Sequence, residues 1–156
     1  MRFAIFATAF AAMGMVAAAF VTPAAAGDLS PAANAAFLAA NAAKPGVVMR
    51  PSGLQYTVLK AGTGRTPKPT DVVRVFYKGW LIDGTVFDQT QPGTPAEFPA
   101  GRLIAGWVEA LSIMKEGDRW QLVIPSNLAY GERGTPGGPI PPNQVLVFEM
   151  ELLAVK

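Results

Sequence analysis

Apolar and polar residues alternate along most of the chain after residue 52, in short stretches separated by glycine- and proline-rich segments. A period of two is typical of strands that bury one face of a sheet. The dipeptide Asp83-Gly84 lies between two such stretches and predicts a β-hairpin with a two-residue turn. Residues 91–101 are predicted to be irregular. The predicted strands cover residues 53–60, 72–82, 85–87, 119–125 and 145–155.

Two stretches have the period of a helix instead. In residues 106–117, the large apolar side chains of Trp107, Leu111 and Met114 share one face, and Gly117 is predicted to cap the C-terminal end. Nearer the N-terminus, an alanine-rich stretch predicts one short helix. Its sequence starts with Ser30 as N-cap and Pro31 in the first turn, and ends at Pro45-Gly46.

These elements predict the fold class. The body of the chain has four or five antiparallel strands, and the helix at 106–117 is the element available to cover an apolar sheet face. We expect an α+β fold, in which a curved antiparallel β-sheet of about five strands wraps around one short α-helix. This domain is predicted at residues 48–156, after a short helical extension at 27–47.

Charged residues indicate which face of each strand meets water. Arg74 and Lys78 alternate with Tyr77, which places Tyr77 on the covered face. The interior is rich in aromatic residues, and periodicity alone leaves open whether they fill a sealed core or line a pocket. Trp80 falls on the exposed face, either under residues 44–60 or in a patch that contacts other proteins. By the same argument, the inward-facing residues of the strands at 119–125 and 145–155 are Trp120, Leu122, Ile124, Leu146, Phe148, Met150 and Leu152.

The first 26 residues have the pattern of a secretory signal. Arg2 precedes an apolar stretch from Phe3 to Val21, and small residues at Ala24 and Ala26 predict cleavage after Ala26. Because the apolar stretch is nearly long enough to span a bilayer, an uncleaved membrane anchor is the alternative. Both interpretations send residues 27–156 out of the cytoplasm.

Composition excludes several classes of function. Removal of Arg2 leaves 12 of the 13 basic side chains against 11 acidic ones, without the basic clustering expected of a nucleic-acid-binding protein. The sequence has no cysteine and no histidine. It therefore lacks thiolate nucleophiles, disulfides, the commonest zinc ligands and a Ser-His-Asp triad. We expect neither a metal nor a cofactor.

Four segments in order carry a specific resemblance: "VFYKGWLIDGTVFD" (75–88), "FPAGRLIAGWVEAL" (98–111), "LAYGERG" (128–134) and "PIPPNQVLVFEMELL" (139–153). They resemble the FKBP family of peptidyl-prolyl cis-trans isomerases in its bacterial form. The segment "KPGVVMRPSGLQYTVLKAGTG" (44–64) is similar to the lead-in of the macrophage-infectivity-potentiator type.

The resemblance implies an apolar pocket rather than a sealed core. Trp107 would form its floor, and a glycine- and proline-rich flap would hang Ile140 over one wall. The backbone N–H of Ile104 and the hydroxyl of Tyr130 would donate hydrogen bonds to a bound peptide, and Asp88 would orient the hydroxyl of Tyr77. The alternative to these roles is that Asp88 is a solvated carboxylate at the end of a strand and that Tyr130 is a loop aromatic that packs on the flap. The implied catalytic residues are Tyr77, Phe87, Asp88 and Tyr130, and the implied substrate-binding residues are Phe98, Leu103, Ile104, Trp107, Ile140 and Phe148.

The implied function is isomerisation of X-Pro bonds in exported proteins, by desolvation in the aromatic pocket and without a covalent intermediate. The alternative is a non-catalytic chaperone or binding module that holds proline-containing chains. If the protein is bacterial, as the resemblance implies, the predicted signal indicates export to the periplasm. The implied partners are unfolded or exported polypeptides that contain proline, and macrolide inhibitors are expected to compete with them.

The chain also departs from the family pattern. Gln89-Thr90 stands where the family usually has small hydroxyl residues, and Thr135 occupies a flap position that is often larger in eukaryotic members. The segment "PGGPIPP" of the flap carries one more glycine or proline than the short form. Close relatives of this type dimerise through a long helical N-terminal domain, whereas the helix predicted here offers only Phe37 and Leu38 as large apolar groups. Such a helix either frays or packs on its own domain, and it is too small to bury the roughly 1,200–2,000 Å² of a stable interface. We expect a monomer.

Overall fold

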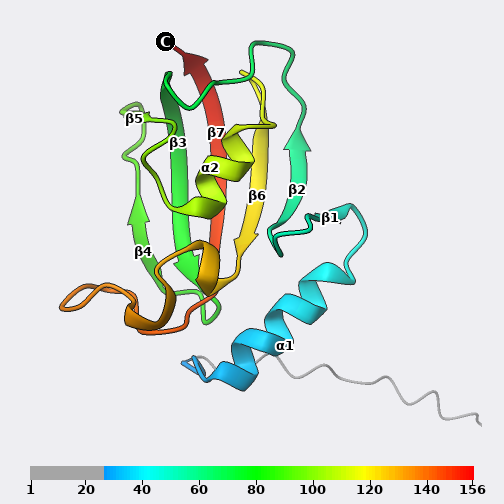
Figure 1. Cartoon of the computed structure of the whole chain (residues 1–156), viewed down its shortest axis with the longest axis vertical. Coiled ribbons are helices and arrows are strands. Elements are labelled where there is room, and N and C mark those ends of the chain that lie inside the picture. The colour runs from blue at the N-terminus through cyan, green and yellow to red at the C-terminus, as the bar shows by residue number, and fades with distance from the viewer. Residues whose placement is uncertain (1–26) are drawn as a thin grey trace, which may run out of the picture.

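Seven antiparallel strands form one sheet in the computed structural model, which describes residues 27–156 (Figure 1). Their order is β1-β2-β6-β7-β3-β4, and β5 pairs with β3 as well. The strands are β1 (Val47–Met49), β2 (Gln55–Lys60), β3 (Val72–Leu81), β4 (Val86–Gln89), β5 (Ala96–Pro99), β6 (Arg119–Ile124) and β7 (Leu146–Val155). The helices are α1 (Pro31–Ala42) and α2 (Ala105–Leu111), with 3-10 turns η1 (Ser126–Leu128) and η2 (Gly131–Arg133).

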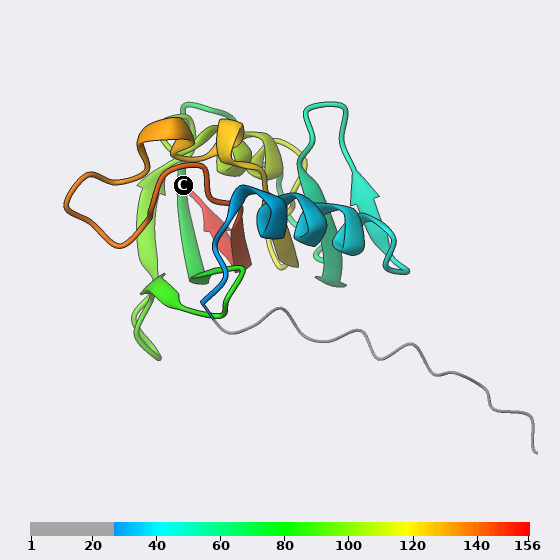
Figure 2. The ribbon, with the colours of Figure 1, turned by 90° about the horizontal axis from the view of Figure 1, so that it is seen from below.

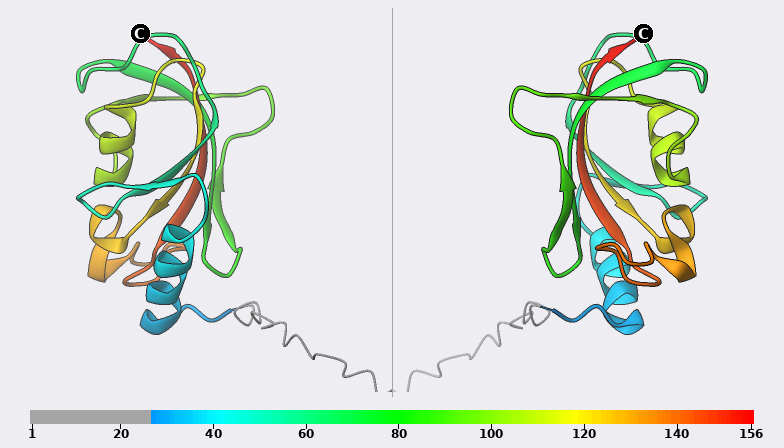
Figure 3. Two further views of the ribbon diagram at one scale, coloured as in Figure 1. Left: turned by 90° about the vertical axis from the view of Figure 1, so that its right-hand side faces the viewer. Right: turned by 90° about the vertical axis from the view of Figure 1, so that its left-hand side faces the viewer.

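The sheet curves around α2, which lies against its concave face (Figure 3). This confirms the predicted α+β fold class and the face that each long strand turns inward. Charged positions of β3, β6 and β7 remain outside, while the apolar positions between them are covered. The side chains buried between the sheet and α2 include Val73, Val75, Leu111, Met114, Trp120, Leu122, Ile124, Leu146, Met150 and Leu152.

The expected number of about five strands was too low, because β1 and β5 were not predicted. β5 lies within the stretch that was expected to be irregular, and it pairs with the first half of β3, from Val72 to Val75. β4 pairs with the second half, from Lys78 to Trp80. Each of these strands has four residues, and β1 has only three. Such short strands are too brief to show a reliable period of two.

The hairpin between β3 and β4 lies where it was predicted, but its turn is longer. The N–H of Leu81 donates to the carbonyl of Thr85 (2.9 Å), and the N–H of Gly84 donates to the carbonyl of Leu81 (2.9 Å). The loop therefore has three residues, 82–84, rather than two. Gly84 has φ +89°, the left-handed conformation that closes a loop of this type.

The predicted cap of α2 was also wrong. The helix ends at Leu111 with Ser112 as its C-cap. Gly117 has φ +94°, but it lies in a separate turn in which the N–H of Asp118 donates to the carbonyl of Lys115 (2.9 Å). The left-handed glycine was recognised correctly, and the turn to which it belongs was not.

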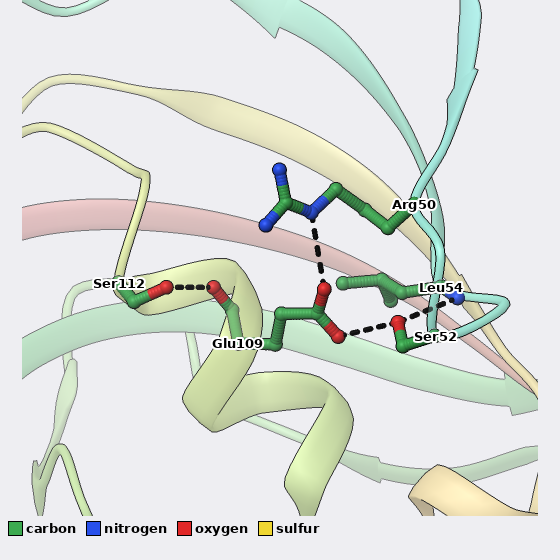
Figure 4. Close-up of polar contacts among 5 residues, drawn as sticks. All are labelled: Arg50, Ser52, Leu54, Glu109 and Ser112. Atoms are coloured by element: carbon green, nitrogen blue, oxygen red, sulfur yellow. Dashed lines mark hydrogen bonds and ion pairs between the residues drawn. The ribbon is translucent and has the colours of Figure 1, made fainter.

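Contacts with the lead-in to β2 hold α2 in place (Figure 4). The carboxylate of Glu109 accepts hydrogen bonds from Arg50 Nε (3.0 Å) and Ser52 Oγ (2.6 Å). The hydroxyl of Ser112 donates to the carbonyl of Glu109 (2.5 Å) and closes the last turn. Because Trp107 belongs to the same helix, these bonds help to hold the element that carries it.

The N-terminal helix packs on its own domain. Ser30 caps α1 as predicted, with its hydroxyl accepting from the N–H of Ala33 (3.2 Å). Phe37 and Leu38 lie in a second apolar cluster, on the side of the sheet away from α2, together with Trp80. Trp80 is half-buried and packs against the same cluster as Phe37 and Leu38. The other members of this cluster are Ile82, Val123, Val145 and Val147.

The predicted signal, residues 1–26, lies outside the described part of the chain. Within residues 27–156, neither helix has the length and apolar character required to cross a bilayer.

Candidate active site

A cavity of about 170 Å³ opens between α2, the curved sheet and the start of the loop that follows η1. It brings together residues from six separate segments of the chain, so no local motif could have formed it alone. Nine of the ten residues implied by the resemblance line it. They are Tyr77 from β3, Phe87 and Asp88 from β4, Phe98 from β5, Leu103, Ile104 and Trp107 at the start of α2, Tyr130, and Phe148 from β7.

Trp107 lies in the middle of the aromatic side chains. Its ring meets those of Tyr77, Phe98 and Phe148 edge to face, with centroids 5.1, 6.0 and 5.2 Å away. Phe87 meets Phe148 in the same manner at 5.4 Å. Edge-to-face contacts between aromatic rings favour one fixed arrangement. The result is a rigid apolar basin whose floor, Trp107, is only 4% exposed.

Tyr77 and Asp88 form the polar rim of this basin. Asp88 pairs with Gly79 across β3 and β4, so it is the diagonal neighbour of Tyr77. The Tyr77 hydroxyl donates a hydrogen bond of 2.6 Å to Asp88 Oδ2. Burial raises the pKa of Tyr77 well above its usual range, and this hydrogen bond raises that pKa further. The hydroxyl is therefore protonated throughout the neutral pH range, and Asp88 fixes its direction.

Two residues that line the basin carry hydrogen-bond donors without an acceptor in the described part of the chain. Ile104 is the N-cap of α2, and its carbonyl accepts from the N–H groups of Trp107 (3.0 Å) and Val108 (3.1 Å). Its own N–H has no acceptor within residues 27–156. Tyr130 is 42% exposed, and its hydroxyl likewise has no partner in the described part of the chain. Both groups can therefore bind the carbonyl oxygens of a ligand.

Ile140 does not line the cavity, contrary to the expectation. We call residues 130–143 the flap. Within it, the N–H of Thr135 donates to the carbonyl of Ile140 (2.9 Å), and the N–H of Ile140 donates to Thr135 Oγ1 (3.0 Å). These bonds fold the flap back on itself, and the Ile140 side chain is buried in the main core with 5% exposure. The sequence placed Ile140 on the flap but could not give the direction of its side chain.

Gly79 is a site residue that the sequence reasoning missed. It occupies an inward position of β3 between Tyr77 and Leu81, where the other inward residues are large. A Cβ atom there would lie 2.6 Å from Phe148 Cε1 and 2.6 Å from Phe87 Cζ. The missing side chain thus provides the space in which the two phenylalanines meet. The signal was present as a gap in the alternation of β3.

Thr90, one of the departures from the family pattern, also supports the site. Its hydroxyl accepts from the N–H of Tyr77 (3.2 Å) and donates to the carbonyl of Tyr77 (3.2 Å). The N–H of Thr90 donates to that carbonyl as well (2.9 Å). Thr90 directly follows β4, and these bonds attach it to the backbone of Tyr77. They therefore connect β3 to the start of the loop that follows β4.

Comparison with known proteins agrees with this geometry. A family model described as FKBP-type peptidyl-prolyl cis-trans isomerase matches residues 63–153, more than half of the chain. A second, described as the domain amino terminal to FKBP-type peptidyl-prolyl isomerase, matches residues 7–58. The second match includes part of the predicted signal.

Curated relatives match over the same region. The FKBP-type 22 kDa peptidyl-prolyl cis-trans isomerase of Escherichia coli is 54% identical over 120 residues, which are 76% of this chain and 58% of that protein. The peptidyl-prolyl cis-trans isomerase Mip of Coxiella burnetii is 52% identical over 122 residues, 78% of this chain and 53% of Mip. The chain thus spans little more than half the length of these relatives.

Solved structures show the same fold. The crystal structure of FkpA from Escherichia coli superposes with a TM-score of 0.76 at 46% identity, over 80% of this chain and 58% of FkpA. A peptidyl-prolyl cis-trans isomerase from Pseudomonas syringae pv. tomato superposes with a TM-score of 0.74 at 44% identity, over 80% of this chain and 94% of that one. With the aromatic basin, the rim and the topology in place, these matches show that the chain belongs to the FKBP-type peptidyl-prolyl cis-trans isomerase family.

Proposed function

We propose that this protein is a peptidyl-prolyl cis-trans isomerase that accelerates rotation about X-Pro bonds in exported polypeptides. The observation that carries the proposal is the combination of an apolar aromatic basin with unpaired donors at its edge. The basin around Trp107 suits a proline ring. Ile104 N–H and the Tyr130 hydroxyl are free to hold the peptide carbonyls on either side of that ring.

The proposed mechanism relies on the electronic structure of the amide. Rotation costs about 18–20 kcal/mol because resonance gives the C–N bond partial double-bond character. The planar amide is strongly dipolar, whereas the twisted amide has lost this charge separation. An apolar pocket therefore favours the twisted state more than water does, and transfer into the pocket lowers the barrier. Uncatalysed exchange takes tens to hundreds of seconds, so even a modest reduction of the barrier accelerates folding usefully.

Asp88 and Tyr77 are assigned the polar part of this mechanism. The carboxylate holds the Tyr77 hydroxyl in one direction through the 2.6 Å hydrogen bond. At the rim it faces the rotating bond, where it interacts differently with the planar and the twisted amide. Phe87 packs edge to face on Phe148 and forms one wall against the proline ring.

A protease-coupled assay on a short X-Pro peptide tests the proposal. The protease cleaves only the trans isomer, so the slow phase of cleavage reports the rate of isomerisation. We expect the full chain to increase the rate of this phase in proportion to its concentration. A slow phase that the protein leaves unchanged, although the peptide binds, would instead assign the pocket to a non-catalytic module that holds proline-containing chains.

Macrolide immunosuppressants of the kind that FKBPs bind are expected to compete with peptide for the basin. Because Trp107 forms its floor, binding should quench the fluorescence of this residue. A titration followed by tryptophan emission and by inhibition of the isomerase assay should give the same dissociation constant. Absence of both effects up to the solubility limit would show that the flap closes the site to these ligands.

We further propose that the protein is exported, in a bacterium to the periplasm, and that it is a monomer. Export rests on the predicted signal, with an uncleaved anchor as the alternative. The monomer is supported by α1, since Phe37 and Leu38 are already used in packing against the sheet of the same chain. Light scattering at tens of micromolar should give a monomer mass. A dimer mass that vanishes when residues 27–43 are deleted would contradict this prediction.

A further inference from the structure

Buried hydrogen bonds join the first turn of α1 to residues 144–145, which directly follow the flap and are called the flap exit below. The Asn34 side chain, 5% exposed, accepts from the N–H of Val145 (2.8 Å) through Oδ1 and donates to Gln144 Oε1 (3.2 Å) through Nδ2. Gln144 is equally buried, and its Nε2 donates to the carbonyls of Leu29 (3.1 Å) and Pro142 (3.0 Å). These bonds form one polar network inside an otherwise apolar contact.

The network connects parts of the chain that are far apart in sequence. Its bonds between Leu29 or Asn34 and residues 144–145 span at least 110 positions. Figures 1 and 2 show α1 and the flap at the same end of the sheet. A buried amide left without partners is costly, so separating the two segments is unfavourable unless water replaces every bond. The start of α1 and the flap exit are therefore held as one unit.

The flap exit is in turn connected to the pocket. The N–H of Asn143 donates to the carbonyl of Gly131 (2.9 Å) and closes the flap at its base. Asn143 has φ +58°, a left-handed conformation that is uncommon for residues other than glycine. Gly131 directly follows Tyr130, whose side chain lines the cavity. The position of Tyr130 thus depends on how well the base of the flap is held.

We propose that Asn34 is a positioning residue of the isomerase site. By binding Gln144 and Val145 it fixes the base of the flap, and through the base it fixes Tyr130. This inference rests on the function proposed above and extends it to a residue outside the pocket. It assigns α1 a part in substrate binding, in addition to covering the outer face of the sheet.

The same helix provides a matched control. Asn41 is 4% exposed, and its Nδ2 donates to Gln55 Oε1 (2.8 Å). Gln55 Nε2 donates to the carbonyl of Leu38 (3.0 Å). Gln55 begins β2, which is separated from β7 by β6. Asn41→Ala therefore removes an equally buried amide from α1 without a bond to the flap.

The experiment compares the two alanine variants in the full chain. We expect Asn34→Ala to raise KM for an X-Pro peptide about three- to tenfold with kcat nearly unchanged, because Tyr130 is displaced while the basin is intact. Asn41→Ala should leave KM within about twofold, although it too should lower the melting temperature. Hydrogen exchange at the amides of Asn143 and Val145 should be faster in Asn34→Ala alone.

Gln144→Ala provides a second route to the same answer if Asn34→Ala does not fold at the assay temperature. It removes the bonds to Leu29 and Pro142, and we expect the same rise in KM. Equal KM values in the flap-linked variants and in Asn41→Ala overturn the proposal. An inactive wild-type protein contradicts the proposed function instead, and hydrogen exchange then still decides whether Asn34 holds the flap.

Discussion

Replacing Asp88 by leucine is expected to lower kcat/KM for X-Pro isomerisation at least about tenfold, which corresponds to a barrier change of roughly 1.4 kcal/mol. The carboxylate accepts the hydrogen bond of the Tyr77 hydroxyl at 2.6 Å, and leucine cannot accept one. Asp88 is exposed at the end of a strand, so the variant should keep its fold. Circular dichroism and the protease-coupled assay together measure the effect.

Gln89 is the matched control for this substitution. It follows Asp88 on β4 and is exposed, but it does not line the cavity. Gln89→Leu should therefore retain the wild-type rate. The additional variant Tyr77→Phe tests whether the carboxylate acts through the hydroxyl, since Asp88→Leu should then cost much less in that background. Wild-type rates in both Asp88→Leu and Tyr77→Phe would remove the rim from the mechanism.

Gly79→Ala is expected to damage both stability and activity, although it adds only one methyl group. The new Cβ would lie 2.6 Å from ring atoms of both Phe87 and Phe148, so at least one wall of the basin must move. Overpacking of this kind costs about 1–3 kcal/mol of the free energy of unfolding. Denaturant unfolding should show that loss, and the isomerase rate should fall at least about tenfold because the proline ring no longer fits.

A second substitution separates the two effects. Gly79→Ala combined with Phe87→Leu relieves the overlap with Phe87, although not the one with Phe148, so the double variant should be more stable than additivity of the single variants predicts. Its activity should remain low, because the wall formed by Phe87 is lost. If the stability losses of the two single variants simply add, the methyl group does not press on Phe87, and the account of Gly79 is wrong.

The strands and the inward-facing residues could be predicted because they follow from period and charge. In β3, the charged side chains of Arg74 and Lys78 mark the outer face, and this fixes Tyr77 on the inner one. The same logic held for β6 and β7. β5 was beyond this reasoning because its four residues gain their structure from pairing with β3, a contact distant in sequence.

The site was predicted less evenly than the fold. The resemblance supplied nine residues that do line the cavity, but periodicity had left open whether the aromatic side chains formed a pocket at all. Ile140 differed because two hydrogen bonds with Thr135 determine its direction, and loop hydrogen bonds leave no periodic trace in a sequence.

The docking of α1 was open for a related reason. Phe37 and Leu38 alone could not distinguish a frayed helix from a packed one. Asn34 and Asn41 attach the helix to the domain by hydrogen bonds to Gln144 and Gln55. The sequence does not show that these residues lie opposite each other, so the role of the two asparagines could not be predicted.

Exchange NMR of an X-Pro peptide at equilibrium tests the central claim most directly. A catalyst must accelerate cis-to-trans and trans-to-cis rotation by the same factor, whereas a module that holds one isomer shifts the populations. With a small molar fraction of the protein, we expect exchange cross-peaks to appear, the cis population to stay unchanged, and Asp88→Leu to abolish most of the acceleration. Unchanged exchange rates, with or without a shift in the cis population, would contradict the assignment of this pocket as an isomerase site.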